Sequence, residues 1–240
     1  MLNNLNIEEI LFLDIETVPI APEFDKLSEN WKKLWRHKMQ FKINDGELPD
    51  DLYDRAGIYA DLGKIICISA GYVIQKKGEY FFRAKSFYDD DEKKLIGNFF
   101  NAWDKFLRAG KQKLCGHNGQ EFDFPYIARR ALVHNLELPK IFDIAGAKPW
   151  EVKETLIDTL QLWKFGDYKH YTSLSLLCEL FNIPTPKDDI DGSEVCNVYW
   201  KDNDLDRIVK YCEKDTLAVA NLLLKYKGDN IIPFDNLESV

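Results

Sequence analysis

The sequence lacks the features that mark secreted, disulfide-linked or zinc-binding proteins. Its five cysteines are scattered and no two of them form a Cys-x-x-Cys pair, so we expect reduced thiols and no zinc site. The first nine residues include no lysine or arginine, and we therefore expect no secretory signal. No apolar run approaches the roughly 20 residues that a membrane helix needs. These absences predict a protein without membrane contact, cytoplasmic by default.

An excess of positive charge is also missing. The net charge is −8, which argues against a protein that coats duplex nucleic acid through many phosphate contacts. An enzyme that acts on one strand end is still compatible with this charge, because bound metal ions add local positive charge. There are no repeats, low-complexity tracts or interdomain linkers, and 45% of the residues are hydrophobic. We therefore predict a single globular domain over residues 1–240.

The hydrophobic pattern alternates between strand and helix periods along the chain. Strands are expected over 10–16, 64–73 and 80–87, with two short ones ending at 115–118 and near 158; helices are expected over 91–108, 174–181 and 205–224, and from about 123. The second and third strands read as a hairpin. This order predicts an α/β fold with a mixed sheet flanked by helices. Residues 20–60 read as a helical insertion after the first strand.

Two carboxylates lie at the end of the first strand. Asp14 and Glu16 are two residues apart, so both side chains point to the same face of the sheet. Taken alone, an Asp-x-Glu pair at the end of a strand is more often a pair of solvated acids than a metal site. If the pair is buried, a divalent cation such as Mg²⁺ or Mn²⁺ removes the repulsion and suits the hard oxygen donors.

A tyrosine and a carboxylate share the apolar face of the last helix. Tyr211 and Asp215 are four residues apart, and both fall on the stripe that includes Ile208, Cys212 and Val219. Taken alone, Tyr211 could be an ordinary core tyrosine and Asp215 an ordinary surface acid. A carboxylate within a buried stripe nevertheless needs a partner, and a metal ion shared with the first strand would supply one.

A third acidic site lies in the segment from Gly116 to Tyr126, which joins a strand to the start of a helix. Active sites of open α/β sheets gather at such turns. Asp123 is the candidate ligand, although an acid at a helix start is also common without any function. Glu121 competes with Asp123 on spacing alone.

The three sites together resemble the motifs of DEDD 3′-5′ exonucleases. Leu13-Asp14-Ile15-Glu16-Thr17 is similar to the first motif, and the Asn118 to Asp123 segment to the second. Tyr211 stands four residues before Asp215, as in the third motif of the tyrosine-bearing subclass. The combination looks most like stand-alone relatives of the family B DNA polymerase proofreading domain. The resemblance implies a ribonuclease H-like fold with a mixed five-stranded sheet.

The resemblance also implies a mechanism with two divalent ions, Mg²⁺ or Mn²⁺. Asp14, Glu16, Asp123 and Asp215 would hold the ions, and Tyr211 would orient the attacking water as the fifth catalytic residue. Four further residues match substrate-binding positions: Thr17, Asn118, Phe122 and Lys187. Asp158 matches a strand-end acid of such domains, either behind the site or as a helix cap.

Residues 20–60 match no core element of these exonucleases. Trp31, Leu34, Trp35 and Met39 predict an apolar helix face, while basic residues lie between and beside them. Aromatic and basic residues together could guide a single strand. The tryptophan spacing favours an amphipathic helix docked on the domain, and we adopt that interpretation.

The function that follows is removal of nucleoside 5′-monophosphates from the 3′ end of single-stranded DNA. RNA or short oligoribonucleotides are the alternative substrates, because no residue can be assigned to reading the 2′-hydroxyl. The other alternative is a catalytically silent module that only binds nucleic acid. The complete carboxylate set with its tyrosine argues against that alternative. No protein partner is predicted.

Overall fold

A mixed six-stranded sheet forms the centre of the protein, here described by a computed structural model. The structure describes the chain except for residues 1–4, 44–45, 109–111, 168–170 and 185–188. The sheet has the order β5-β4-β1-β2-β3-β6. Its strands are β1 (Ile10–Pro19), β2 (Gly63–Lys76), β3 (Glu79–Tyr88), β4 (Lys113–Gly116), β5 (Leu156–Asp158) and β6 (Leu237–Ser239). β1 pairs antiparallel with β2 and parallel with β4.

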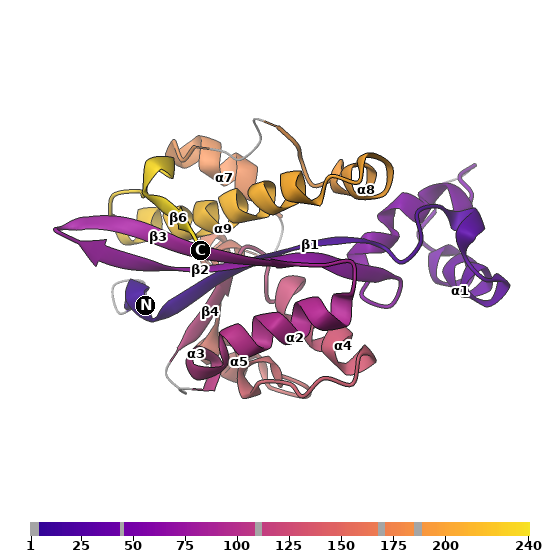
Figure 1. Cartoon of the computed structure of the whole chain (residues 1–240), viewed down its shortest axis with the longest axis horizontal. Coiled ribbons are helices and arrows are strands. Elements are labelled where there is room, and N and C mark those ends of the chain that lie inside the picture. Colours follow the sequence, from indigo (N-terminus) through magenta and orange to yellow (C-terminus); the bar gives the residue numbers. More distant parts are fainter. Residues whose placement is uncertain (1–4, 44–45, 109–111, 168–170, 185–188) are drawn as a thin grey trace.

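Helices cover both faces of the sheet. In Figure 1, α7 and α9 lie above the sheet, while α2, α4 and α5 lie below it. The α-helices are α1 (Glu29–Met39), α2 (Glu92–Ala102), α3 (Asp104–Arg108), α4 (Asp123–Val133), α5 (Pro149–Thr155), α6 (Thr159–Lys164), α7 (Leu174–Phe181), α8 (Val195–Asn197) and α9 (Leu205–Lys227). Short helical turns are η2 (Ile7–Glu9), η3 (Phe24–Lys26), η4 (Pro49–Ile58), η5 (Lys140–Phe142) and η7 (Phe234–Asn236), and η6 (Val198–Asp202) is a π-helix.

Strand alternation on β1 divides the interior into two layers. Leu11, Leu13 and Ile15 pack with residues of α2 and α4 in one cluster. Ile10 and Phe12 pack on the opposite face, in a cluster that includes Leu217 and Leu223 of α9. Because side chains two residues apart share a face, Asp14 and Glu16 point to the α9 side. The fold therefore sets both strand carboxylates against the last helix.

The predicted fold class is confirmed, since helices flank a mixed sheet in an arrangement consistent with the ribonuclease H-like exonuclease fold. The predicted hairpin is β2 and β3, whose turn uses Lys77 and Gly78 at positive φ. The expected helix over 91–108 is interrupted at Trp103, where α2 ends and α3 follows. The sequence pattern predicted five strands and missed β6, whose three residues are too few to give a period.

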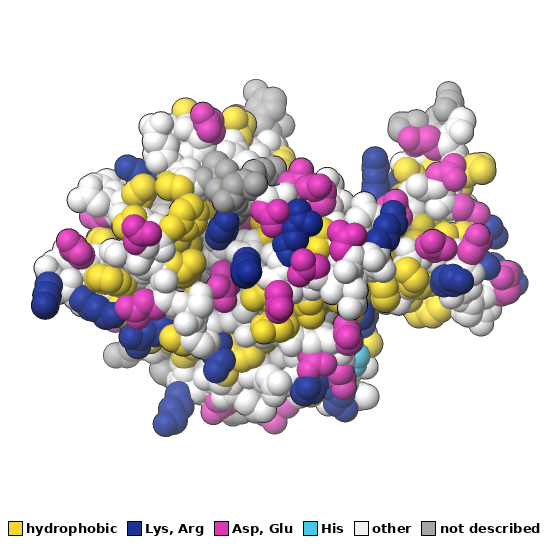
Figure 2. Space-filling model, turned by 45° about the horizontal axis from the view of Figure 1, so that its top comes forward, with side chains coloured by type: hydrophobic (Ala, Val, Ile, Leu, Met, Phe, Trp, Pro, Cys, Tyr) yellow, Lys and Arg dark blue, Asp and Glu magenta, His cyan; other side chains and the backbone are white. Residues whose placement is uncertain are grey.

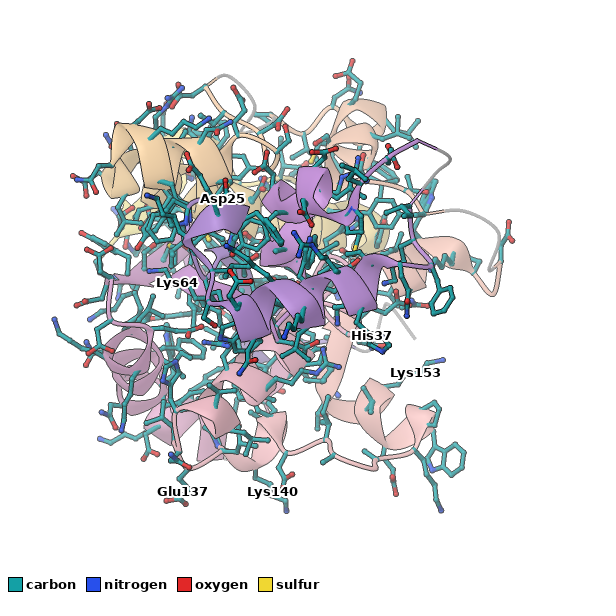
Figure 3. The ribbon with its side chains drawn as sticks, turned by 90° about the vertical axis from the view of Figure 1, so that its right-hand side faces the viewer. Asp25, His37, Lys64, Glu137, Lys140 and Lys153 are labelled. Carbon is teal, nitrogen blue, oxygen red and sulfur yellow. The ribbon has the colours of Figure 1, made fainter. Side chains whose placement is uncertain are left out.

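The insertion after β1 forms a small helical lobe at one end of the molecule (Figures 1 and 3). Trp35 and Met39 of α1 pack with residues of η4 such as Leu52 and Tyr53 in a cluster of their own. The Trp35 indole donates a hydrogen bond to the Pro49 carbonyl at 2.6 Å. α1 is therefore a docked helix, as expected.

Of the four residues predicted to form the apolar face of α1, only Trp35 and Met39 are buried. Trp31 is 39% exposed and Leu34 is 55% exposed, because η4 covers only the side of α1 that carries Trp35 and Met39. Two basic residues of α1 form ion pairs within the lobe, as Arg36 contacts Asp50 at 2.6 Å and Lys38 contacts Asp61 at 2.6 Å. His37 lies at the outer surface of the lobe in Figure 3.

Charges of both signs are mixed over the surface. Figure 2 shows acidic and basic side chains interspersed on this face, without a continuous basic surface. Within the described residues, no helix is both long enough and apolar enough to cross a membrane. All five cysteines are free thiols, as expected.

Candidate active site

β1 positions two of the predicted carboxylates side by side. In the register with β2, Asp14 lies opposite Ser69 and Glu16 lies opposite Cys67. Glu16 is 8% exposed and Asp14 is half-buried, on the face of the sheet that α9 covers. The register with β2 shifts between Glu16 and Thr17, and such a bulge re-aims the side chains beside it. These acids are therefore not the solvated pair that a strand end alone would give.

The start of α4 brings a third carboxylate to β1. Asp123 is the first residue of α4 and is 3% exposed. Its Oδ1 accepts a hydrogen bond from the backbone N–H of Ile15 at 3.1 Å, so it lies directly beside the strand pair. Glu121 is exposed to solvent. The structure thus brings Asp123 into the cluster and leaves the competing acid Glu121 outside it.

α9 contributes the tyrosine and the fourth carboxylate. Its apolar stripe packs on β1 and β2, and Tyr211 is 8% exposed within that contact. The Tyr211 hydroxyl and the Asp215 carboxylate share a hydrogen bond. The charge of Asp215 acts on both Glu16 and Asp14. All five predicted catalytic residues therefore meet at one place, between the middle of β1 and α9.

The pKa values of the clustered carboxylates indicate a cation-binding site. Burial, followed by the negative charges of neighbouring carboxylates, raises the pKa of Asp14 and of Glu16 well above the ordinary range. Burial raises the pKa of Asp123 to about 7, against the lowering effect of backbone hydrogen bonds that include the one from Ile15. Like charges held together in this way are stable when a cation lies between them. Because hard carboxylate oxygens suit Mg²⁺ and Mn²⁺, the donor set fits divalent ions.

A thiol that the sequence analysis did not single out also faces the carboxylates. Cys212 Sγ lies 3.4 Å from Asp14 Oδ2 and 3.5 Å from the Asp14 carbonyl oxygen. Asp14, Glu16 and Cys212 each offer a ligand atom, and these three atoms lie within 4.8 Å of one another. Cys212 was visible in the sequence only as a member of the apolar stripe, which is where an ordinary core cysteine also falls.

Asp158 anchors the loop that leads to Asp123. Its carboxylate accepts hydrogen bonds from the backbone N–H groups of Asn118 at 2.9 Å and Gln120 at 3.1 Å. The same carboxylate caps α6 by accepting from Leu160 N–H at 2.9 Å. Asp158 is thus both the cap of α6 and a support for the loop that leads to Asp123. The sequence predicted one role or the other, and the structure shows both.

Three of the predicted substrate-binding residues lie on the segments that carry the carboxylates: Thr17 on β1, and Asn118 and Phe122 in the loop before Asp123. Phe122 is half-buried, with its ring centroid 5.4 Å from that of Tyr126. Thr17 shares a hydrogen bond with the Tyr126 hydroxyl. Asn118 has a positive φ of 62°, and its Oδ1 is buried with no hydrogen-bond partner within the described part of the chain. Lys187 lies outside the described residues.

Tyr171 is a neighbour of the site that the motifs did not reveal. The residue is 67% exposed as a whole, but its hydroxyl is partly buried, and this burial, followed by the charges of Asp123 and Asp158, raises the pKa of the hydroxyl. The next residue, Thr172, accepts a hydrogen bond from His117 Nε2 through its carbonyl at 2.9 Å. No periodic pattern marks Tyr171, because it lies between α6 and α7.

Similarities to known proteins include a family model and a relative from an archaeon. A family model described as a predicted 3′-5′ exonuclease related to the exonuclease domain of PolB matches residues 58–228, more than half of the chain. The matched range contains Asp123, Tyr211 and Asp215, whereas Asp14 and Glu16 precede it. An uncharacterized protein of Methanocaldococcus jannaschii is 28% identical over 130 residues, which cover 52% of this chain and 66% of that relative.

Proposed function

This chain belongs to the family of predicted 3′-5′ exonucleases related to the exonuclease domain of PolB, and we propose that it hydrolyses the terminal phosphodiester bond at the 3′ end of single-stranded DNA. The observation that carries the proposal is the clustering of Asp14, Glu16, Asp123 and Asp215, with the Tyr211 hydroxyl next to Asp14, Glu16 and Asp215. Two divalent ions, Mg²⁺ or Mn²⁺, are the cofactors that this oxygen-rich set would hold.

When bound, such ions lower the pKa of a coordinated water and neutralise charge on the phosphate that is cleaved. The carboxylates of Asp14, Glu16, Asp123 and Asp215 would hold them, and the charges of the other three acids all act on Asp14. In the overall reaction a water oxygen bonds to the terminal phosphorus and the bond from phosphorus to the 3′ oxygen breaks. The products are a nucleoside 5′-monophosphate and a strand shortened by one nucleotide with a new 3′-hydroxyl.

Tyr211 orients the water as a hydrogen-bond donor or acceptor and is not the base. Burial and the three acids Asp215, Glu16 and Asp14 raise the pKa of its hydroxyl above the ordinary value of 10.0. The phenol therefore stays protonated at neutral pH, where it can position a neighbouring oxygen but cannot remove a proton from it. Its hydrogen bond with Asp215 fixes the ring relative to the metal-binding carboxylates.

The end of the strand is bound by residues near Asp123. Phe122 offers an aromatic face to a base, a contact that tolerates any sequence. Asn118 has a buried amide oxygen without a partner in the described chain, and a nucleotide that donates a hydrogen bond would satisfy it. Thr17 stands at the bulge next to Glu16, and Lys187 would approach a phosphate.

The test is a nuclease assay on 5′-labelled single-stranded DNA and on RNA of the same sequence, each with a free 3′-hydroxyl. Mg²⁺ and Mn²⁺ reactions run beside EDTA controls. We expect a ladder that shortens from the 3′ end, with DNA degraded faster than RNA. Faster degradation of RNA would reassign the substrate. Binding of both strands without hydrolysis under either metal would identify a silent binding module and overturn the proposed activity.

A further inference from the structure

Tyr126 is a buried residue of α4 that contacts two of the predicted substrate-binding residues. Only 1% of it is exposed. Its ring centroid lies 5.4 Å from that of Phe122, and its hydroxyl shares a hydrogen bond with Thr17. Phe122 and Thr17 are themselves half-buried, the first in the loop before Asp123 and the second on β1. One side chain therefore joins the loop and the strand that carry the carboxylates.

Backbone from two further elements encloses the Tyr126 hydroxyl. The hydroxyl donates a hydrogen bond to the Gly57 carbonyl at 2.8 Å. A Cβ at Gly63, the first residue of β2, would stand 2.2 Å from the hydroxyl oxygen, so only a glycine leaves room for it. Gly57 belongs to η4 of the helical lobe, and a Cβ there would lie 3.1 Å from the backbone of Val18. The base of the lobe is therefore packed against β1 directly after Thr17.

The two hydrogen bonds of Tyr126 determine which atom donates in each. A tyrosine hydroxyl has one proton and a carbonyl oxygen only accepts, so the Tyr126 proton is directed to Gly57. The Thr17 hydroxyl is then the donor in its bond with Tyr126. Thr17 is left with lone pairs alone, and these accept a hydrogen bond from a sugar hydroxyl but not from a phosphodiester oxygen, which has no proton.

We propose that Tyr126 is a positioning residue for the end of the strand. Its hydroxyl orients Thr17 as an acceptor for a sugar hydroxyl at the 3′ end, and its ring supports the Phe122 ring. This inference rests on the proposed function, because it concerns how the same site binds its substrate. It also gives the helical lobe a role, since the Gly57 carbonyl at the base of the lobe directs the Tyr126 proton.

The experiment compares Tyr126→Phe with Tyr53→Phe as the matched control. Tyr53 is also buried, and its hydroxyl accepts a hydrogen bond from the Ala21 N–H at 3.2 Å within the lobe. Both substitutions keep the ring and remove one hydrogen-bonded hydroxyl. The kcat and KM of each full-length protein are measured in Mg²⁺ on single-stranded DNA that ends in a 3′-hydroxyl or in a 2′,3′-dideoxynucleotide. Dissociation constants for both strands are measured in EDTA, which removes the ions needed for hydrolysis.

We expect the wild type and Tyr53→Phe to prefer the 3′-hydroxyl strand by about five- to tenfold in kcat/KM and in affinity, and Tyr126→Phe to prefer it by less than about twofold. The loss should lie in KM, with kcat nearly unchanged, because the contact binds the strand and does not act on the reacting atoms. A merely structural role would weaken both strands equally and leave their ratio as it is. An unchanged ratio in Tyr126→Phe, or an equal loss in Tyr53→Phe, would overturn the proposal.

A second pair of variants covers the case in which Tyr126→Phe fails to fold. Thr17→Val removes the acceptor at nearly constant shape and should lose the preference for the 3′-hydroxyl strand, whereas Thr17→Ser keeps a hydroxyl and should retain it. When all variants fold, the double variant should lose no more than either single one, and additive losses would refute the link between Tyr126 and Thr17. Hydrolysis by the wild type without the preference removes only this inference. Binding that shows the preference without hydrolysis removes only the proposed activity.

Discussion

The Asp123 carboxylate accepts a hydrogen bond at 3.1 Å from the backbone N–H of Ile15, the residue between Asp14 and Glu16. This single contact joins the first turn of α4 to the middle of β1. It places one carboxylate beside the other two although 108 residues separate the partners along the chain. Any shift of β1 relative to α4 therefore changes the spacing of the proposed metal ligands, which links the stability of the fold to the geometry of the site.

The first prediction concerns Asp123 and the pH dependence of stability without metal. The folded state holds the Asp123 proton more tightly than the unfolded state does, since its pKa is raised from 3.8 to about 7. This contribution to stability is fully present below the unfolded pKa and is lost as pH rises through about 7. In EDTA, we expect the wild type to lose about 2–4 kcal/mol relative to Asp123→Asn between pH 4 and pH 8.

Chemical denaturation of both proteins across this pH range measures the difference. Added Mg²⁺ should remove most of the loss at pH 8, because the ion stabilises the charged form. A wild type that gains stability over the variant as pH rises in EDTA would show that the Asp123 pKa is not raised.

The second prediction concerns Asp158, which supports the loop before Asp123. Asp158→Ala removes the acceptor for Asn118 and Gln120 N–H groups and the cap of α6. We expect a loss of about 2–4 kcal/mol in the free energy of unfolding. Ser173→Ala removes a cap of α7 with one hydrogen bond, to Leu176 N–H at 3.3 Å, and should cost only about 1 kcal/mol. Equal costs for the two variants would contradict the supporting role.

The third prediction concerns Gly119, where a side chain does not fit. A Cβ at this position would stand 2.9 Å from an atom of the Phe124 ring. Gly119→Ala must therefore displace α4 near Asp123, with a cost of about 1–3 kcal/mol and reduced nuclease activity. Gly97→Ala is the control, since a Cβ there meets nothing within 4 Å and lies in α2. Thermal unfolding and nuclease assays of both variants test this prediction. Equal stability and equal activity of Gly119→Ala and Gly97→Ala would show that the loop accommodates the added methyl group.

The fourth prediction concerns the Tyr211 hydroxyl. Tyr211→Phe keeps the buried ring and removes the group that bonds Asp215. We expect kcat to fall by about 10²-fold while the KM for the DNA strand changes little, because a water-positioning group acts on the reacting atoms. A fall confined to KM would place Tyr211 in strand binding instead. The pH–rate profile should keep the same shape in the variant, because the wild-type phenol is not the base and its ionisation does not limit the rate.

Periodicity in the sequence predicted the parts of the site that lie on long regular elements. The strand alternation of Asp14 and Glu16 and the four-residue spacing of Tyr211 and Asp215 fix their faces before any tertiary contact is known. Asp123 and Glu121 could not be separated in this way, because both precede or begin a helix. The hydrogen bond from Ile15, which is far away in sequence, and the burial of Asp123 distinguish them in the structure.

The missed features depend on tertiary contacts in the same way. Cys212 shares the apolar stripe of α9, and a thiol fits a core as well as it fits a metal site. Trp31 looks apolar enough to be buried but stays 39% exposed, since η4 covers the adjacent face of α1. β6 is only Leu237–Ser239, and its pairing with β3 gives it strand geometry without a pattern of its own.

The most direct test of the account measures hydrolysis of 5′-labelled single-stranded DNA by four proteins in Mg²⁺. These are the wild type, Asp14→Asn, Asp215→Asn and Glu121→Gln, with circular dichroism to confirm that each is folded. The exposed acid Glu121 is the matched control, because it lies in the same loop as Asp123 but outside the cluster. We predict ladders from the wild type and Glu121→Gln and intact strands with the other two. Hydrolysis that survives both Asp14→Asn and Asp215→Asn would contradict the assignment of the carboxylate cluster as the active site.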